Sequence, residues 1–217
     1  MGKFVWTSND ATNHTLSLID DYMLENANYI LDVGCGYGYV SHSLERRGFN
    51  VYSIDFKDFR RVCSKNFSLY DGVNIPFKDN VFDLIMVVFV LHHIPNEKKP
   101  LILKEIYRVA KDYMFVLEDT PRTWLDKLIS RNHGYNYRRM IGSRESFGFY
   151  SEEEWKRIFS NTGFEVIECL PLSRFSRCYF QPFCRFKFAM RKIRWDCEGN
   201  GFLSTRVLIK GSRENGK

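Results

Sequence analysis

Residues 30–39 read Ile30-Leu31-Asp32-Val33-Gly34-Cys35-Gly36-Tyr37-Gly38-Tyr39, an apolar run that ends in a loop with a glycine at every second position. Such a run is typical of a buried strand, and the glycines permit the positive φ angles of a sharp turn into a helix. Because glycine has no Cβ atom, a ligand can approach the backbone closely. The stretch therefore predicts a strand that ends at a ligand-binding loop.

A dinucleotide-binding loop is the main alternative, because its G-x-G-x-x-G pattern also follows a strand. Counted from Gly34, the third glycine of that pattern is replaced by the bulky Tyr39, at the point where helix and strand must pack closely. Asp32 at the end of the strand would repel phosphate and attract a cationic amine or sulfonium. The loop therefore favours a positively charged ligand over a nicotinamide dinucleotide, with an ordinary Gly-rich turn as the remaining alternative.

Three further blocks follow this loop in order. Val51–Asp55 is a second short apolar run that ends in an acid, about 20 residues beyond the loop, where a carboxylate can hold both hydroxyls of a ribose. The third block is Leu69–Phe77, and the fourth runs from Asp79 to Pro95 through a long apolar stretch. The order and spacing of the four blocks are more specific than any one of them.

These four blocks resemble the class I S-adenosylmethionine-dependent methyltransferases, especially the group that includes the ubiquinone and menaquinone biosynthesis methyltransferases. The resemblance is strong over about residues 28–120 and loose elsewhere. It implies a Rossmann-like α/β fold with a mostly parallel seven-stranded sheet and helices on both faces. It also implies methyl transfer as the activity and S-adenosylmethionine as the cofactor.

The resemblance also implies a cofactor site. Asp32 and the glycine backbone would hold the methionine part, which the Val88–Phe89 backbone would close, while Asp55 would hold the ribose hydroxyls. Asp71 would accept from the adenine amino group, and the Gly72 N–H would reach a ring nitrogen. A single acid in a loop more often caps a turn than binds a ligand. Four blocks that match the family in the same order are less expected by chance than any one of them. The cofactor-binding residues are then Asp32, Gly34, Gly36, Asp55, Asp71, Gly72 and Val88.

Composition agrees with one methyltransferase domain over residues 1–217, since 44% hydrophobic and 16% aromatic content can build a core without a metal or a disulfide. The six cysteines show no C-x-x-C pair or zinc-ligand spacing, which predicts no metal site and indicates reduced thiols in a cytosolic protein. The longest uncharged apolar run, Leu84–Leu91, is far shorter than the roughly 20 residues of a membrane span. With no basic-then-apolar signal at its start, the chain is expected to be cytoplasmic.

Hydrophobic periodicity predicts alternating strands and helices. Leu16, Ile19, Tyr22 and Met23 indicate one helix before the first strand. Ser151 with Glu154 forms a capping box and Gly163 a stop, which predicts a helix over 152–162. The other expected helices are Val40–Arg47 and about 97–110. The expected strands lie near 29–33, 50–55, 66–70, 82–90, 112–118, 164–170 and 203–210, the last of them antiparallel if the family topology holds.

The chemistry needs few protein groups, because a sulfonium already activates its methyl and the enzyme mainly aligns the nucleophile. A base is required only where the nucleophile must lose a proton. In open α/β sheets the reactive end lies beyond the carboxyl ends of the strands. His92 and His93 follow the fourth strand, and Glu118 and Asp119 follow the fifth. His92, His93 and Asp119 are therefore the candidate catalytic residues, although the two histidines could equally pack and cap a loop.

Two segments combine basic and aromatic residues. Pro121–Tyr150 fits a lid over an acidic or planar substrate, or a solvated amphipathic helix pair. Arg174–Trp195 contains no acid and alternates basic with aromatic residues. That composition suits RNA or an anionic membrane surface, but equally a structural role in which the aromatics pack on the last strands.

The sequence thus predicts an S-adenosylmethionine-dependent methyltransferase whose methyl acceptor is a small-molecule or lipid-like metabolite. An RNA methyltransferase is one alternative, and peripheral membrane contact is compatible with either. A non-catalytic module that binds the cofactor is another, but a pocket without a ligand need not keep Asp32, Asp55 and Asp71 together. The sequence leaves the accepting atom and the oligomeric state open.

Overall fold

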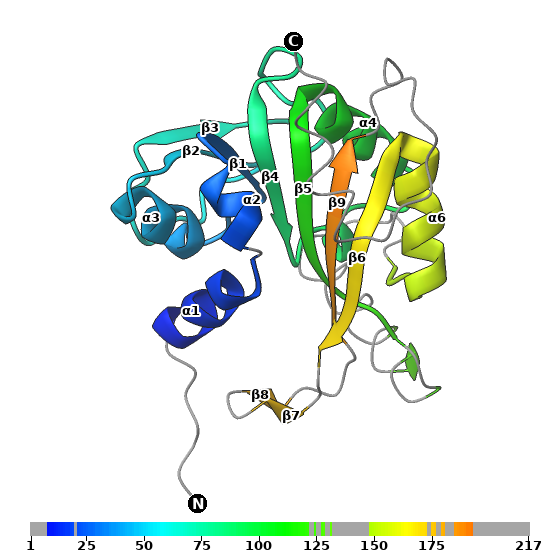
Figure 1. The fold of residues 1–217 in the computed structure, drawn as a ribbon. Helices are drawn as coiled ribbons and strands as arrows, with labels where there is room; N and C mark the ends of the chain where they lie inside the picture. Colours follow the sequence, from blue (N-terminus) through cyan, green and yellow to red (C-terminus); the bar gives the residue numbers. More distant parts are fainter. Residues whose placement is uncertain are drawn as a thin grey trace, which may run out of the picture.

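The structure is a computed structural model that describes residues 8–19, 21–121, 124, 127–128, 131, 148–172, 175–176, 179–180 and 185–192. Its centre is a seven-stranded sheet in the order β3-β2-β1-β4-β5-β9-β6 (Figure 1). The strands are β1 Tyr29–Val33, β2 Asn50–Asp55, β3 Asn66–Leu69, β4 Phe82–Val88, β5 Ala110–Asp119, β6 Phe164–Leu172 and β9 Arg185–Lys192. Strands β1 to β5 are parallel, and β9 runs antiparallel to both of its neighbours, β5 and β6. This is the mostly parallel α/β sheet that the sequence predicted.

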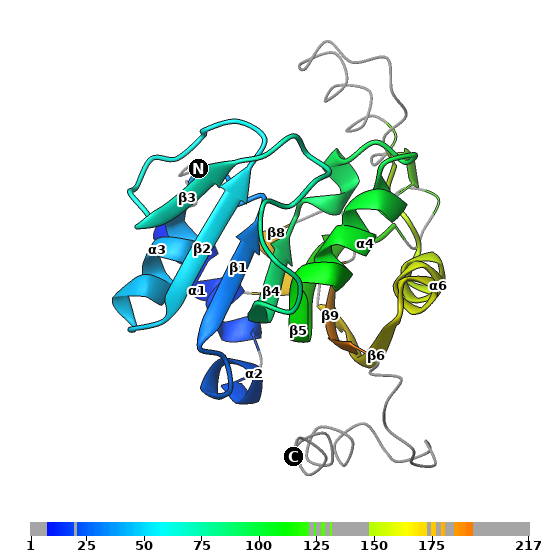
Figure 2. The same cartoon turned by 90° about the horizontal axis from the view of Figure 1, so that it is seen from above.

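Helices cover both faces of the sheet (Figure 2). They are α1 Ser8–Leu18, α2 Asp21–Glu25, α3 Tyr39–Arg46, α4 Lys99–Val109 and α6 Glu152–Thr162, with the 3-10 turn η1 Leu91–His93. Strands β7 Phe175–Ser176 and β8 Tyr179–Phe180 form a separate pair. None of these helices has the length and apolar character that a membrane span requires.

Two hydrophobic cores form because side chains alternate across the central strands. In β4, Ile85 and Val87 join the core under α4 and α6, whereas Leu84 and Met86 join the core under α1, α2 and α3. Both sets are completely buried. The same alternation directs Asp32, at the end of β1, toward α3.

Several elements begin and end at predicted residues because their signals are local. The capping box is present, since the Ser151 hydroxyl accepts from the Glu154 N–H while the Glu154 carboxylate accepts from the Ser151 N–H. Gly163 ends α6 with a φ of 103°, in the left-handed conformation that glycine favours.

The prediction of one helix before β1 was wrong. The chain forms α1 and α2 as two short helices, and the buried Leu16, Ile19 and Met23 still share one core. The second helix begins at Asp21, and negative charge is favoured at a helix N-terminus. Periodicity alone therefore identified the buried face but not the break.

The sequence did not predict the antiparallel strand that the structure shows. The antiparallel strand of the sheet is Arg185–Lys192, inside the segment 174–195 that the sequence offered either as a partner-binding surface or as a structural part of the last strands. Residues 203–210, the predicted strand, lie outside the described residues. Because β9 is hydrogen-bonded on both sides and Met190 is completely buried, this part of the segment is a structural element of the sheet. The period-two pattern of Arg185-Phe186-Lys187-Phe188 is a strand signal.

Candidate active site

The loop after β1 folds back across the end of β2. The backbone N–H groups of Gly34 and Cys35 both donate to the carbonyl oxygen of Ile54, at 2.8 and 3.2 Å. Gly34 has a φ of 71°, and a Cβ at this position would lie 2.6 and 2.8 Å from the two methyl carbons of Val90. Gly34 is therefore required by both backbone and packing, because the loop after β4 presses against it.

At Gly36 the backbone conformation favours glycine, whereas packing does not require it. Its φ is 52°, and a Cβ built on it would meet no atom within 4 Å. Its N–H donates to the Asp55 carboxylate at 2.9 Å. Gly38, with a φ of 79°, is the N-cap residue of α3. The side of the loop that Gly36 faces is therefore open, as a surface that receives a ligand must be.

Asp32 lies beneath this loop and is 2% exposed. Its carboxylate accepts a hydrogen bond from the Ser41 hydroxyl of α3. Burial raises the pKa of Asp32 to about 6; the bond from Ser41 opposes this shift, and the nearby Asp55 adds to it. The sequence did not identify Ser41, which holds this acid in place. A cationic group above the loop would favour the ionised form of Asp32.

Asp55 ends β2 and is buried. One carboxylate oxygen accepts from the Gly36 N–H at 2.9 Å and the other from the Phe56 N–H at 2.8 Å. Burial raises the pKa of Asp55, and these backbone donors partly offset the shift. The acid lies beside the glycine loop, as predicted, although it also caps the turn that follows β2.

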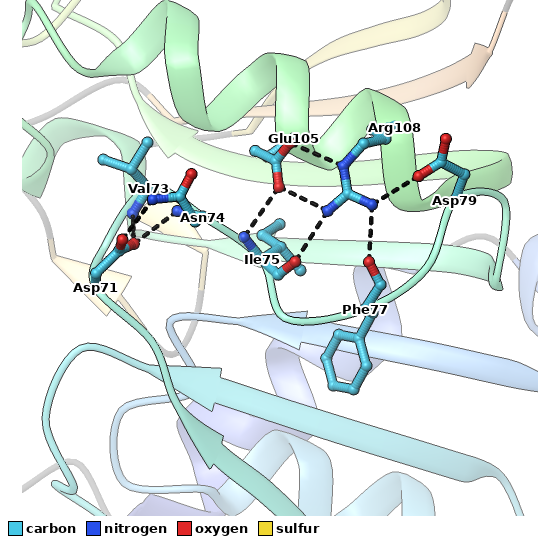
Figure 3. A network of polar contacts seen from close by, with 8 residues as sticks. All are labelled: Asp71, Val73, Asn74, Ile75, Phe77, Asp79, Glu105 and Arg108. Carbon is cyan, nitrogen blue, oxygen red and sulfur yellow. Dashed lines mark hydrogen bonds and ion pairs between the residues drawn. The ribbon is translucent and has the colours of Figure 1, made fainter.

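Asp71 caps a turn in the loop between β3 and β4 (Figure 3). One of its oxygens accepts from the N–H groups of Val73 and Asn74, at 2.8 and 2.6 Å. The other accepts from the Asn74 side-chain amide, the contact that contributes most to lowering the pKa of this exposed carboxyl. Gly72 has a φ of 85°, which allows the tight turn. The turn-capping interpretation of Asp71 is therefore correct, and the carboxylate keeps further acceptor capacity.

The segment after β4 closes the opposite side of the loop. Val88 is the last residue of β4, and Phe89 follows with a φ of 56°, a conformation that a bulky residue adopts only where its surroundings hold it. The Phe89 N–H donates to the Leu117 carbonyl at 2.8 Å. Val90 then packs against Gly34. The strained backbone of Phe89 therefore lies where the ends of β1, β4 and β5 converge.

His92 and Glu118 form a buried pair at the carboxyl ends of β4 and β5. His92 Nδ1 contacts a Glu118 carboxylate oxygen, and its side chain is only 4% exposed, that of Glu118 not at all. A carboxylate accepts hydrogen bonds, so the imidazole proton belongs on Nδ1 and Nε2 is the acceptor in the neutral ring. The Asp119 N–H donates to Glu118 at 3.0 Å, and the ring of His93 lies 3.9 Å from that of His92. Of the candidate catalytic residues, the structure thus joins His92 to Glu118 through side chains, while His93 adjoins the His92 ring and Asp119 contacts Glu118 through its backbone.

Residues 148–150 lie beside His92 and Lys99. The Phe149 ring stacks on His92 with centroids 4.7 Å apart. Lys99 of α4 is 1% exposed and donates to the Gly148 carbonyl at 2.6 Å, with its ammonium group 4.3 Å from the Tyr150 ring centroid. Burial lowers the pKa of Lys99 to about 8, and Glu118 opposes the shift. The sequence gave no signal for these contacts.

The proposed lid lies largely outside the described residues, which include few positions between Pro121 and Gly148. Among the described ones, Trp124 and Leu128 are exposed. At the end of this segment, Gly148, Phe149 and Tyr150 contact Lys99 and His92.

The sequence matches the family described as "Methyltransferase domain" over residues 11–169. A protein of Mus musculus named "Probable tRNA methyltransferase 9B" is 25% identical over 199 residues, which cover 86% of this chain and 42% of that protein. The ubiquinone biosynthesis O-methyltransferase of Hahella chejuensis is 26% identical over 133 residues, which cover 54% of this chain and 55% of that protein. The chain thus matches about half the length of these curated relatives.

Solved structures share the fold. An S-adenosylmethionine-dependent methyltransferase of Methanosarcina mazei superposes with a TM-score of 0.62 at 20% identity, covering 80% of this chain and 95% of that one. The magnesium protoporphyrin IX methyltransferase of Synechocystis, solved with bound S-adenosylhomocysteine, gives a TM-score of 0.58 at 16% identity and covers 88% and 90% of the two chains. Since the family match spans most of the chain and the sheet order and the glycine loop agree with it, this protein belongs to the class I methyltransferase family, whose cofactor is S-adenosylmethionine.

Proposed function

We propose that this protein transfers the methyl group of S-adenosylmethionine to a small-molecule or lipid-like acceptor. One observation carries the proposal. Asp32 and Asp55, both buried, lie near the carboxyl ends of adjacent parallel strands beside a glycine loop that is open at Gly36. Two acids beside bare backbone suit a ligand with a cationic end and a ribose diol, but not a phosphate-rich dinucleotide.

In the proposed complex the glycine loop supports the methionine part. Asp32 provides the negative potential for the amine and sulfonium, and the open side of Gly36 leaves room for the methionine carbon chain. Asp55 accepts from the ribose hydroxyls through acceptor sites that Gly36 and Phe56 leave available. A carboxylate offers about four such sites, and backbone donors of Gly36, Phe56 and Lys57 use three of them.

The adenine would lie against the turn at Asp71. Three protein donors use the carboxylate in the structure, so about one of its four acceptor sites remains for an amino group. Gly72 follows with its N–H in the same turn, where it would donate to a ring nitrogen. Val88 and the backbone after it would close the methionine side.

The methyl acceptor would approach between the end of β4 and the returning segment at Phe149. His92 is the proposed general base, because its contact with Glu118 keeps the proton on Nδ1 and leaves Nε2 as the basic atom. Where the nucleophile carries a proton, that proton would pass to Nε2 while the nucleophile forms its bond to the methyl carbon and the carbon–sulfur bond breaks, with S-adenosylhomocysteine as the leaving group. His93 and Asp119 are proposed to line the same space, with the segment 121–150 as the lid.

An RNA acceptor is the second candidate. The similarity to the mouse protein named as a probable tRNA methyltransferase extends over 86% of this chain, whereas the similarity to the Hahella protein covers 54%. Part of the basic segment 174–195 no longer supports this candidate, because Arg185–Lys192 is a strand of the sheet.

Methyl transfer from radiolabelled S-adenosylmethionine separates these candidates. The purified protein is incubated with a bulk tRNA fraction, a lipid extract and a panel of phenolic and amine metabolites. The proposal predicts label in a low-molecular-weight or lipid product and none in RNA. Label in tRNA would establish the second candidate instead, and cofactor binding without transfer to any acceptor would favour a non-catalytic module.

A further inference from the structure

The loop that carries Asp71 is fastened to α4 by one arginine (Figure 3). Arg108 donates to the Ile75 carbonyl at 2.9 Å, the Phe77 carbonyl at 2.7 Å and the Asp79 carboxylate at 2.7 Å. Its two remaining donors meet both carboxylate oxygens of Glu105, at 2.8 and 2.6 Å. All five N–H donors of the guanidinium therefore have acceptors, and three of these lie on the loop.

Glu105 completes the attachment from one turn earlier on α4. Its carboxylate accepts the Ile75 N–H at 3.1 Å. Both backbone polar groups of Ile75 are thus held by α4, and its side chain is 3% exposed in the core. The pKa of Glu105 is lowered and that of Arg108 raised, in each case chiefly by their mutual hydrogen bonds, so both groups stay charged.

One residue, Asn74, connects the fixed Ile75 to the Asp71 carboxylate. Asn74 precedes Ile75, and both its backbone N–H and its side-chain amide donate to the Asp71 carboxylate. Freeing Ile75 would let Asn74 move, and the Asp71 carboxylate with it. The Asp71 carboxylate also accepts from the N–H of the neighbouring Val73, a contact within the same turn, so the connection of this exposed turn to α4 runs through Asn74.

We propose that Arg108 and Glu105 are positioning residues for the adenine side of the cofactor site: they fix Ile75, and through Asn74 they set the place of the Asp71 carboxylate. This inference rests on the proposed function, in which Asp71 accepts from the adenine amino group. Neither Arg108 nor Glu105 touches the cofactor in this arrangement. Their effect is on discrimination between purines rather than on the chemistry.

Calorimetry with two ligands tests the inference. S-adenosylhomocysteine carries the 6-amino group, and S-inosylhomocysteine replaces it with a carbonyl. The wild type should bind the amino ligand about tenfold or more tightly, the scale of one lost charge-assisted hydrogen bond. Arg108→Met should lose most of that preference, because the amino ligand weakens about tenfold while the inosine ligand changes less than about twofold.

Two variants make the experiment specific. Arg108→Lys keeps the charge but cannot reproduce the planar five-donor fork, so it should resemble Arg108→Met. Lys111→Met is the matched control: it lies three residues further along the chain and breaks a 2.7 Å ion pair with Asp83 on β4, away from the loop. This control should leave both ligand affinities unchanged. If Arg108→Met does not fold, Glu105→Gln should still show a partial loss of preference.

The outcomes separate the inference from its premise. A wild type that binds both ligands equally would show that Asp71 does not read the amino group, so the adenine assignment fails and the positioning role falls with it. A wild type that prefers the amino ligand and Arg108 variants that keep this preference would overturn the positioning role alone. An equal loss for both ligands would also overturn it, because that result indicates general disruption of the pocket.

Discussion

The Asp55 carboxylate accepts a hydrogen bond from the backbone N–H of Gly36 at 2.9 Å. The acid at the end of β2 thereby fixes the loop at the end of β1, so the two parts of the cofactor site are mechanically linked before any ligand binds. Preorganisation of this kind reduces the conformational entropy lost on binding. It also means that changes in the loop and at the acid affect each other.

Two glycines of the loop should respond differently to alanine. In Gly34→Ala the new Cβ would clash with Val90 at a position with positive φ, so we expect a loss of about 2–4 kcal/mol in unfolding free energy. Gly36→Ala adds only backbone strain of about 1–2 kcal/mol, since its Cβ meets open space. Its larger effect should be on S-adenosylmethionine binding, measured by calorimetry beside urea unfolding. Unchanged affinity in Gly36→Ala would show that no ligand lies over this residue.

Asp32→Asn should trade stability against binding in a pH-dependent way. The folded protein keeps the Asp32 proton up to about pH 6, whereas the ordinary pKa is 3.8, so ionisation lowers stability as the pH rises through this range. The amide carries no such penalty, and the variant should be more stable by up to about 3 kcal/mol at about pH 7.5, with no advantage below about pH 4. S-adenosylmethionine affinity should fall. A variant that is less stable at both pH values would contradict this account.

His92→Asn should lower kcat by about 10²–10⁴-fold if the imidazole is the base. The affinity for S-adenosylmethionine should change less than about twofold, since His92 contacts Glu118 and Phe149 rather than the glycine loop. Glu118→Gln should give a smaller loss in kcat, because an amide orients the ring but stabilises its cation poorly. Single-turnover rates measured across pH test both. If His92→Asn keeps the wild-type rate, the His92–Glu118 pair has only a packing role.

Asp83 should matter for folding but not for binding. Its buried carboxylate accepts the N–H groups of Asn28 and Tyr29, at 3.0 and 2.9 Å, and pairs with Lys111. Burial opposes ionisation, but these donors together lower the pKa of Asp83, so its stabilising effect is present above about pH 4 and lost in more acidic solution. Asp83→Ala should cost about 2–4 kcal/mol at neutral pH. A shift in cofactor affinity instead would indicate that the amino ends of the strands communicate with the site.

Local signals explain what the sequence predicted well. Strand β1 and helix α6 begin and end where an apolar run, a capping box and a stop glycine place them. The acids Asp32 and Asp55 were recognisable because parallel strands bring their carboxyl ends to the same edge of the sheet. The place of both acids at that edge thus follows from the strand that precedes each of them.

Contacts between distant segments account for what the sequence did not predict. Arg108 meets Ile75 across 33 positions, and Lys99 meets Gly148 across 49, so no short pattern could indicate either contact. The strand β9 carried a period-two pattern, but its basic and aromatic composition is equally typical of a binding surface. Of the two interpretations that the composition allowed, the structure supports the structural one for Arg185–Lys192.

The central claim is that the ends of β1 and β2 form an S-adenosylmethionine site. Calorimetric titration of the wild type and Asp55→Ala with S-adenosylmethionine, and of the wild type with NAD, tests it most directly. The account predicts saturable binding of S-adenosylmethionine, none of NAD, and a loss of about 2–4 kcal/mol in Asp55→Ala, because a bidentate charge-assisted contact to the ribose disappears. Equal S-adenosylmethionine affinity of the two proteins, or preferential binding of NAD, would contradict it.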